Sequence, residues 1–389
     1  MPTVTDSKKA AIKEMKQRLC QIFHQSHAVM SNHQVVTTKK LVLHFDLNKT
    51  IVPVDSATGE TVEAALNVYL SGLAQGKDRE GEWHSKHVLS VDPSEQDDVS
   101  FYKFQEKRLL PDINRDRHAF RCHLMSFTDK PQGSKFKPHL KELLDVLKWD
   151  LEYDETLHKE LTVPGNESCR FFFVLPAFYK LLSYLVEENR DFTVIFRTYG
   201  SDSRSVISSM RQAISNGLPF CKNLSQLSDQ IAEDVVLLRR NANNENMFNI
   251  STQDADDICV NSNEQMYEWL SEMTGINAIR DNVKDWLDRK FDSRFGKPLW
   301  IDRADDKHHH IFFDDNIRPG MFDSIVNIRC RGNADDNFHT VPRADEHAFL
   351  NHNIVPVTFT EAILDKQYFI HKLQLCEQNY DTQTQTDVS

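Results

Sequence analysis

The sequence predicts an α/β protein built on a parallel sheet, and three observations support this class. Short apolar runs that have the length of buried strands recur along the chain. Segments with apolar residues three or four positions apart separate several of these runs, as in amphipathic helices. Several of the strand runs are apolar throughout, which is typical of parallel strands covered on both faces. We therefore expect strands that alternate with helices in one central sheet.

The composition excludes several classes of protein. The chain has 389 residues, and its 46 Lys and Arg against 58 Asp and Glu give a net charge of −12. An acidic chain lacks the positive surface of a general nucleic-acid binder. The hydrophobic content of 40% is too high for a disordered chain. Only 12 glycines are present, which argues against a glycine-rich phosphate loop.

The cysteines and the apolar segments indicate a compartment. Seven cysteines are spread over the chain without a CxxC pair, so they predict neither a disulfide framework nor a zinc ribbon. The first residues are charged where a signal peptide needs an apolar core. The longest apolar stretch, at 171–179, is shorter than the roughly 20 residues that a membrane span requires. We expect a cytoplasmic protein that binds no membrane.

The elements of the first part of the chain follow from the spacing of apolar residues. A packing helix is expected over about 8–23, and a strand at 41–45 follows it. The next helical pattern covers 57–75. Residues 76–100 are strongly polar and are expected to form a loop. The segment 101–160 is expected to be helical in part, most clearly at Leu140, Leu143, Leu144 and Leu147.

A second α/β unit begins with a helix that starts at Pro176. It leads into a strand at 192–197 and a helix at 203–215. The region 221–290 gives no clear pattern except a helical stretch around 269–286. Three further short strands are expected at 299–301, 311–313 and 325–328. The last ten residues are polar and are expected to fray.

Polar side chains follow three of the predicted strands at the point where each strand ends. These residues are Asp46, Thr198 and the pair Asp314–Asp315. Asp after a strand often serves only as a turn former. However, the carboxyl ends of parallel strands meet at one edge of the sheet, where ligands bind. Carboxylates that hold Mg²⁺ and a hydroxyl that binds phosphoryl oxygens are what a phosphoryl-transfer site needs.

Four segments resemble the motifs of the haloacid dehalogenase (HAD) superfamily. HFDLNKTIV (44–52) resembles the first motif, and FTVIFRTYGSD, which contains Thr198, resembles the second. FGKPLWID offers Lys297 for the third motif. HHHIFFDDN resembles the fourth, a strand that ends in paired acids. The resemblance covers about 41–56 and 172–335.

The resemblance implies a HAD-like Rossmannoid parallel sheet with helices on both faces and an inserted, mainly helical cap. The expected division of the chain is an N-terminal packing helix and lead-in, a core in two parts, the cap and a polar tail. These segments are 1–40, 41–56 plus 172–375, 57–171 and 376–389.

The resemblance also implies roles for the motif residues. Asp46 would be the nucleophile that takes the phosphoryl group as an aspartyl-phosphate. Thr198 and Lys297 would hold the phosphoryl oxygens. The implied Mg²⁺ ligands are Asp46, the backbone carbonyl of Asn48, and Asp314 or Asp315. The expected substrate is a phosphorylated small molecule, for which Asn48 and Arg197 are further candidate contacts; surface salt bridges are the alternative role for Arg197.

Asn48 departs from the phosphatase pattern, in which this position is a second Asp that protonates the leaving group. General acid–base help is worth about 10²–10⁴ in rate, and an amide cannot give it. We therefore expect a slow or atypical phosphatase or phosphotransferase. One alternative is a protein that binds Mg²⁺ and a phosphorylated ligand without turnover. Another is a dehalogenase-type hydrolase, since those members of the superfamily also lack the second Asp.

The three consecutive histidines His308–His310 are residues of a type that binds metals, so a metal cluster is one interpretation of this run. Consecutive residues of an extended segment alternate between faces, so the three side chains cannot readily share one ion. We interpret the run as the polar entry of a strand.

Overall fold

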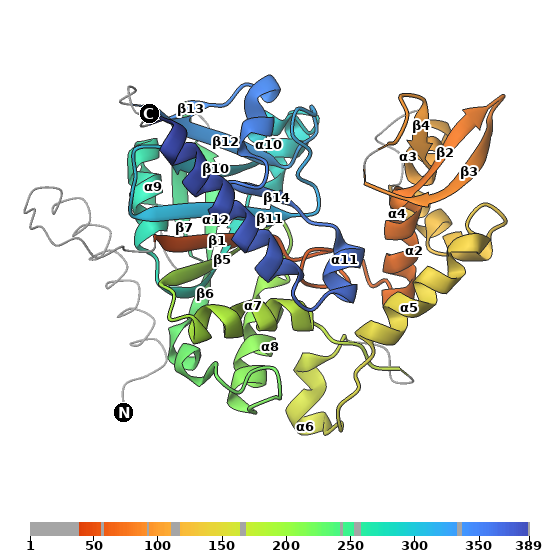
Figure 1. Cartoon of the computed structure of the whole chain (residues 1–389), viewed down its shortest axis with the longest axis horizontal. Helices are drawn as coiled ribbons and strands as arrows, with labels where there is room; N and C mark the ends of the chain where they lie inside the picture. The colour runs from red at the N-terminus through yellow and green to blue at the C-terminus, as the bar shows by residue number, and fades with distance from the viewer. Residues whose placement is uncertain are drawn as a thin grey trace, which may run out of the picture.

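A mixed α/β fold with a largely parallel central sheet accounts for most of the chain (Figure 1). The computed structural model describes residues 39–55, 58–91, 93–109, 117–163, 169–241, 244–252, 258–332 and 337–387. The packing helix expected at 8–23 lies outside these residues. Within them, no helix is both long enough and apolar enough to cross a membrane.

The central sheet has the strand order β14-β11-β1-β5-β9-β6-β7-β8. The strands from β14 to β6 run parallel to one another, whereas β7 and β8 are antiparallel additions at one edge. The bounds are β1 Lys40–Phe45, β5 Phe192–Thr198, β6 Ile231–Asn241, β7 Asn244–Ser251, β8 Ile258–Val260, β9 Gly275–Asp281, β11 His308–Asp314 and β14 Ile354–Pro356. The strands expected at 41–45, 192–197 and 311–313 are thereby confirmed as parallel neighbours.

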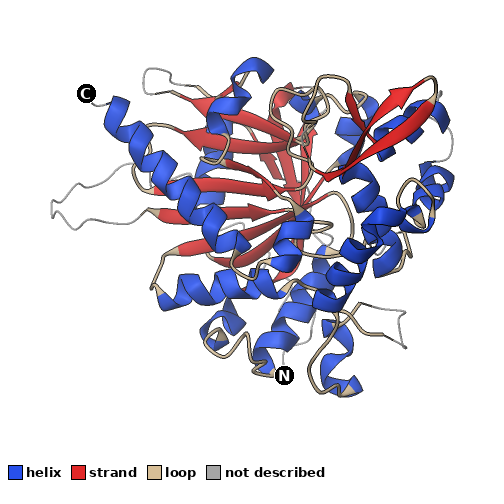
Figure 2. Cartoon of the chain, turned by 45° about the vertical axis from the view of Figure 1, so that its right-hand side comes forward, coloured by secondary structure: helices blue, strands red, loops and turns tan. Residues whose placement is uncertain are grey.

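Alternate side chains of β1 enter two different hydrophobic clusters, as the period of two in a strand requires. Leu41, Leu43 and Phe45 belong to a cluster that includes residues of α7 (Pro176–Glu187), α8 (Ser203–Ser215) and α12 (Tyr368–Asp387). Val42 belongs to another cluster, with residues of α9 (Asn263–Glu272) and Trp300. Both faces of the sheet are therefore covered (Figure 2).

Strands of a separate sheet cover part of the second face of the central sheet, and this packing was not predicted from the sequence. β10 (Lys297–Asp302), β12 (Val326–Arg331) and β13 (His339–Thr340) form a separate three-stranded sheet. The runs 299–301 and 325–328 are strands, as expected, but they pair with each other and not with the central sheet. Their apolar residues pack against Phe312 of β11, which explains why the runs are apolar.

The segment between β1 and α7 contains both helices and a small antiparallel sheet. Its main elements are α2 Val62–Leu73, β2 Ala74–Arg79, β3 Glu82–Leu89, β4 Asp98–Ser100, α3 Phe101–Leu109, α4 Arg117–Leu124, α5 Lys137–Leu147 and α6 Glu155–His158. The helices expected at 57–75 and around Leu140 are present, but the loop expected at 76–100 is wrong. Lys86 of β3 binds Glu95 and Asp98, so ion pairs support these polar strands while Trp83 is buried beneath them.

Two further expectations need correction. The helical stretch expected around 269–286 is interrupted by β9, because α9 ends at Glu272 and its C-cap, Met273, already has extended backbone. Gly275, with a left-handed φ of +69°, then begins the strand. The C-terminal tail does not fray at residue 380, because α12 continues to Asp387 and buries Cys376. The remaining elements are α10 Val283–Asp288, α11 Phe359–Leu364 and the 3₁₀ turns Phe127–Asp129, Ser134–Phe136, Lys159–Leu161, Ser225–Gln230, Ser293–Phe295 and Arg343–Phe349.

Candidate functional site

The candidate site lies at the carboxyl ends of three adjacent parallel strands. β1 lies between β11 and β5, and Phe45 pairs with Phe313 on one side and Phe196 on the other. The backbone N–H of Asp46 donates to the carbonyl of Phe313 at 2.9 Å, which continues the ladder to the last residue. This register brings Asp46, Asp314 and the end of β5 to the same edge of the sheet. In Figure 1, the inserted segment 58–163 lies on the side toward which β1 leads.

Lys297, the first residue of β10, connects these strand ends. Its Nζ donates to Asp46 Oδ1 at 2.5 Å, to Asp314 Oδ2 at 2.8 Å and to the carbonyl of Arg197 at 3.1 Å. Its side chain has 0% exposure. Burial alone would lower the pKa of Lys297, but the charges of Asp314 and Asp46 raise it above its ordinary value. Lys297 is therefore a fixed cation between two carboxylates.

Asp46, Asp314 and Asp315 form a carboxylate cluster in which oxygens lie within 4.8 Å of one another. Burial raises the pKa of Asp46 to about 7, with Lys297 opposing the rise and Asp314 adding to it. Burial, and then the charges of Asp314 and Asp46, also raise the pKa of Asp315 well above its ordinary value. Burial and mutual repulsion thus oppose the ionisation of these acids. A divalent cation, whose preferred ligands are carboxylate oxygens, would relieve this repulsion, so the cluster suits such an ion.

Backbone contacts hold the acids in place. The N–H of Asn316 donates to Asp314 Oδ1 at 2.8 Å, and the N–H of Asp315 donates to Thr50 Oγ1 at 3.2 Å. The second bond ties the turn after β1 to the end of β11. Within that turn, Lys49 has a left-handed φ of +61°, which lets the chain reverse directly after the candidate nucleophile.

Thr198 and Asn48 lie together with a residue that the motif comparison did not assign. Thr198 Oγ1 accepts from the N–H of Gly200 at 3.0 Å, so its own hydrogen can be donated to a ligand. Asn48 Nδ2 donates to Asp202 Oδ2 at 3.0 Å. Asp202 directly precedes α8, and from the sequence alone an aspartate at this position indicates only a helix cap. Its buried carboxylate beside Asn48 is the acidic group that sequence reasoning missed.

Arg197 is not placed for substrate binding, and this assignment must be corrected. Its Nε and one terminal nitrogen donate to the two carboxylate oxygens of Asp281 at 2.9 and 2.6 Å. The other terminal nitrogen donates to the carbonyl of Pro298 at 3.1 Å. The side chain has 0% exposure, so it does not form the surface salt bridge that was the alternative either. Arg197 joins β5 to β9 and β10 inside the protein.

The inserted segment contributes charge to the edge of the site. Burial lowers the pKa of Lys49, and the positive charge of Arg121 in α4 lowers it further, while Asp315 opposes both effects. The hydroxyl of Tyr69 in α2 accepts from the N–H of Phe359 at 2.8 Å, and Asp315 adds to the effect of burial in raising the pKa of Tyr69. Residues of α2 and α4 therefore face the same end of the sheet as the acids.

No protein-family model, curated protein or solved structure matches this chain. The site must therefore be interpreted from its own geometry. In that geometry Asp46, Lys297, Asp314 and Asp315 come together, Thr198 and Asn48 lie beside Asp202, and Arg197 is turned toward Asp281.

A second acidic cluster, Glu95, Asp97 and Asp98, lies on the surface of the inserted segment. Lys77 lies 2.6 Å from Glu95 and 3.0 Å from Asp97, and Lys86 lies 2.8 Å from Asp98. Each of the three carboxylates thus already pairs with a lysine, so we assign no metal to this cluster.

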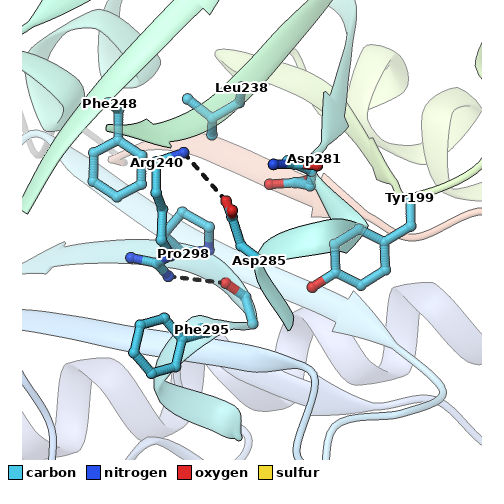
Figure 3. A pocket seen from close by; sticks show the side chains of 10 residues that line it. Tyr199, Leu238, Arg240, Phe248, Asp281, Asp285, Phe295 and Pro298 are labelled. Atoms are coloured by element: carbon cyan, nitrogen blue, oxygen red, sulfur yellow. Dashed lines mark hydrogen bonds between the residues drawn. The ribbon is translucent and has the colours of Figure 1, made fainter. Parts of the chain in front are cut away.

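A small pocket is lined by the two chain neighbours of Lys297, Gly296 and Pro298, among other residues (Figure 3). Its walls include Tyr199, Arg240 and Asp285. The guanidinium of Arg240 donates to the carbonyl of Gly296 at 3.0 Å, and its backbone N–H donates to Asp285 at 3.4 Å. Lys297 Nζ lies 5.1 Å from the centre of the Tyr199 ring, so the pocket adjoins the acids without containing them. We place the candidate site at the acids.

Proposed function

We propose that this protein is a Mg²⁺-dependent phosphatase or phosphotransferase of the HAD type, acting through Asp46. The observation that carries the proposal is the buried contact of Lys297 with both Asp46 and Asp314, beside Asp315, at the end of the central strand. A nucleophilic carboxylate, a fixed cation and further metal-binding carboxylates are the parts that phosphoryl transfer through an aspartate requires.

In this proposal Asp46 attacks phosphorus and the leaving group departs. Water or an alcohol then attacks the aspartyl-phosphate, which releases Asp46. Lys297 and the hydroxyl of Thr198 stabilise the charge that develops on the phosphoryl oxygens. Asp46, Asp314 or Asp315, and the carbonyl of Asn48 would hold Mg²⁺. The bound metal would neutralise the cluster, so that an anionic phosphate can approach the anionic nucleophile.

The geometry also bears on the two alternatives. A dehalogenase-type reaction needs no metal, so it leaves the cluster of Asp46, Asp314 and Asp315 without a purpose. A binding protein without turnover remains the second candidate, because Asn48 provides no acid at the position after the nucleophile. It would use the same cluster to bind Mg²⁺ and a phosphorylated ligand. Turnover of a phosphoester decides between these two functions.

The first prediction concerns hydrolysis of p-nitrophenyl phosphate. We expect Mg²⁺-dependent release of p-nitrophenol that is lost in Asp46→Asn, because an amide is not a nucleophile at phosphorus. The measurement is the steady-state rate with Mg²⁺ and with EDTA. Asp229→Asn, at an exposed aspartate, serves as the matched control and should retain the rate. Activity that survives in Asp46→Asn would exclude the mechanism.

A further inference from the structure

The structure shows a defined pair where the phosphatase pattern has a single acid. Asn48 Nδ2 donates to Asp202 Oδ2 at 3.0 Å. An ionised carboxylate only accepts hydrogen bonds, so the amide nitrogen must face Asp202 and the amide oxygen must face the other way. That oxygen, Asn48 Oδ1, is covered from solvent and has no donor among the described residues. A covered acceptor of this kind calls for a donor that arrives with a ligand.

A space beside the pair has polar walls. A Cβ atom placed on Gly200 would lie 3.6 Å from Thr198 Oγ1, 3.6 Å from Asp202 Oδ2 and 3.9 Å from Asn48 Nδ2. The absence of a side chain at Gly200 leaves this point open among three polar groups. Because a carboxylate forms one wall, a phosphoryl oxygen is repelled there. A hydroxyl group, which carries no negative charge and can donate a hydrogen bond, is accepted.

We propose that Asp202 is a positioning residue that fixes the orientation of Asn48, and that the pair binds the hydroxyl group of the water or alcohol that reacts at phosphorus. This inference rests on the proposed function, because it assigns a role within the same site. The carboxylate that the phosphatase pattern has at position 48 is then supplied here by Asp202, directly before α8. The pair Asn48 and Asp202 then replaces one acidic residue by two residues from different segments.

The test compares wild type with Asp202→Asn, Asn48→Asp and the exchange variant that carries both changes. In Asp202→Asn the charge that fixes the amide is lost, and the new amide can turn either its oxygen or its nitrogen toward Asn48. We therefore expect kcat to fall about tenfold with KM within about twofold. In Asn48→Asp two carboxylates face each other, so we expect lower kcat and a lower Tm. In the exchange variant donor and acceptor trade places, so kcat and Tm should return toward wild type.

Controls separate positioning from a merely structural role. Asp154→Asn alters an aspartate that also directly precedes a helix, in the inserted segment, and should leave kcat and KM unchanged. Gly200→Ala fills the open space at ordinary contact distances and should lower kcat while Tm stays constant. An unchanged kcat in Asp202→Asn, or an exchange variant no better than the weaker single variant, overturns the inference.

A second readout distinguishes failure of the inference from failure of the proposed function. If wild type shows no turnover, the proposed enzymatic function fails, and the binding of orthovanadate with Mg²⁺ is measured on the same variants. Vanadate carries an apical oxygen in the place of the reacting hydroxyl. About tenfold weaker binding to Asp202→Asn than to wild type or Asp154→Asn supports the pair as a hydroxyl site. Equal binding overturns it.

Discussion

Removing the Lys297 ammonium should lower the stability of the fold, because this cation is buried between two carboxylates. Its ammonium is the fixed positive charge in contact with both Asp46 and Asp314, and the side chain is fully buried. Removing one member of a buried ion pair leaves an uncompensated charge, which costs about 3–5 kcal/mol. A divalent cation bound by the same carboxylates would supply the missing positive charge.

We therefore expect Lys297→Met to lower the free energy of unfolding by about 3–5 kcal/mol without metal, and by less when Mg²⁺ is saturating. Thermal unfolding with EDTA and across a Mg²⁺ titration measures both values. Lys284→Met provides the control, because Lys284 forms an exposed pair with Asp288 and should change stability by less than about 0.5 kcal/mol. A loss in Lys297→Met that Mg²⁺ leaves unaltered would contradict a shared cation site.

At the scale of the elements, a line of buried polar side chains crosses the central strands. Arg197 of β5 donates to His44 of β1 at 3.4 Å, and His44 lies 3.2 Å from His310 of β11. His310 in turn lies 2.9 Å from Ser271 of α9. Because Ser271 Oγ donates to the carbonyl of Tyr267, it accepts from His310, and both histidines are then neutral with hydrogen on Nε2. His310 is therefore an interior residue and not a polar strand entry.

This line predicts a pH dependence of stability. Burial lowers the pKa of His310 to about 3, that of neighbouring His309 to about 4 and that of His44 well below its ordinary value. In the unfolded chain each of the three imidazoles takes up a proton near pH 6.5, whereas in the folded protein they stay neutral at that pH. The three histidines therefore stabilise the fold fully above pH 6.5, and this contribution is lost as the pH falls from 6.5 toward 4 and 3.

The measurement is the free energy of unfolding by urea between pH 8 and pH 5. We expect His310→Leu to unfold more readily at pH 8, because it breaks the line, but to lose stability less steeply as the pH falls. Each unit of pH below 6.5 should cost about 1.4 kcal/mol less than in wild type, since one fewer proton is taken up. His139→Leu, at an exposed histidine, should keep the slope of wild type. An unchanged slope in His310→Leu would contradict the burial of a neutral imidazole.

The elements differ in how far sequence predicts them. β1, β5 and β11 were predictable because apolar runs of strand length end in polar residues, and this pattern also located Asp46 and Asp314. β2 and β3 were not, because ion pairs to Lys77 and Lys86 support them and leave no apolar run. The separate sheet formed by β10 and β12 was not predictable either, because an apolar run indicates a strand but does not name its partner.

Sequence also predicts the candidate site only in part, because it does not show which residues distant in the chain come into contact. Asp46, Lys297, Asp314 and Asp315 could be proposed from motif order alone, and the structure brings them together. The partner of Arg197 is Asp281, far away in sequence and without any motif, so only the folded chain reveals it. Asp202 was overlooked because an aspartate before a helix already has an ordinary explanation as a cap.

At the scale of the whole molecule, the inserted segment and the sheet share one hydrophobic core. A single cluster of buried residues runs from Leu43 and Phe45 in β1 through Leu66 in α2 to Phe127. A region that folded alone would have its own core. We therefore expect the described chain to unfold as one unit, with the insert and the sheet together.

Phe127→Ala tests this expectation from within the insert. Phe127 is fully buried, and its ring centre lies 4.9 Å from that of Phe101. Truncation should cost about 3–5 kcal/mol and shift a single calorimetric transition to lower temperature. Leu157→Ala, at an exposed side chain of the insert, should leave the transition in place. Two transitions, of which only one moves, would show that the insert is a separate domain.

The central position of β1 has a consequence for the order in which the protein folds during synthesis. Leu41 pairs with Phe192, which is 151 residues further along the chain (192 − 41), and Lys40 pairs with His308, 268 residues further along (308 − 40). Closing loops of this length is entropically costly, and contacts between distant residues form slowly. The strand that carries Asp46 leaves the ribosome before either neighbour, and it has at most one of them, β5, until β11 has been made. The carboxylate cluster is therefore complete only after β11 emerges, and until then the apolar edge of β1 depends on protection from aggregation.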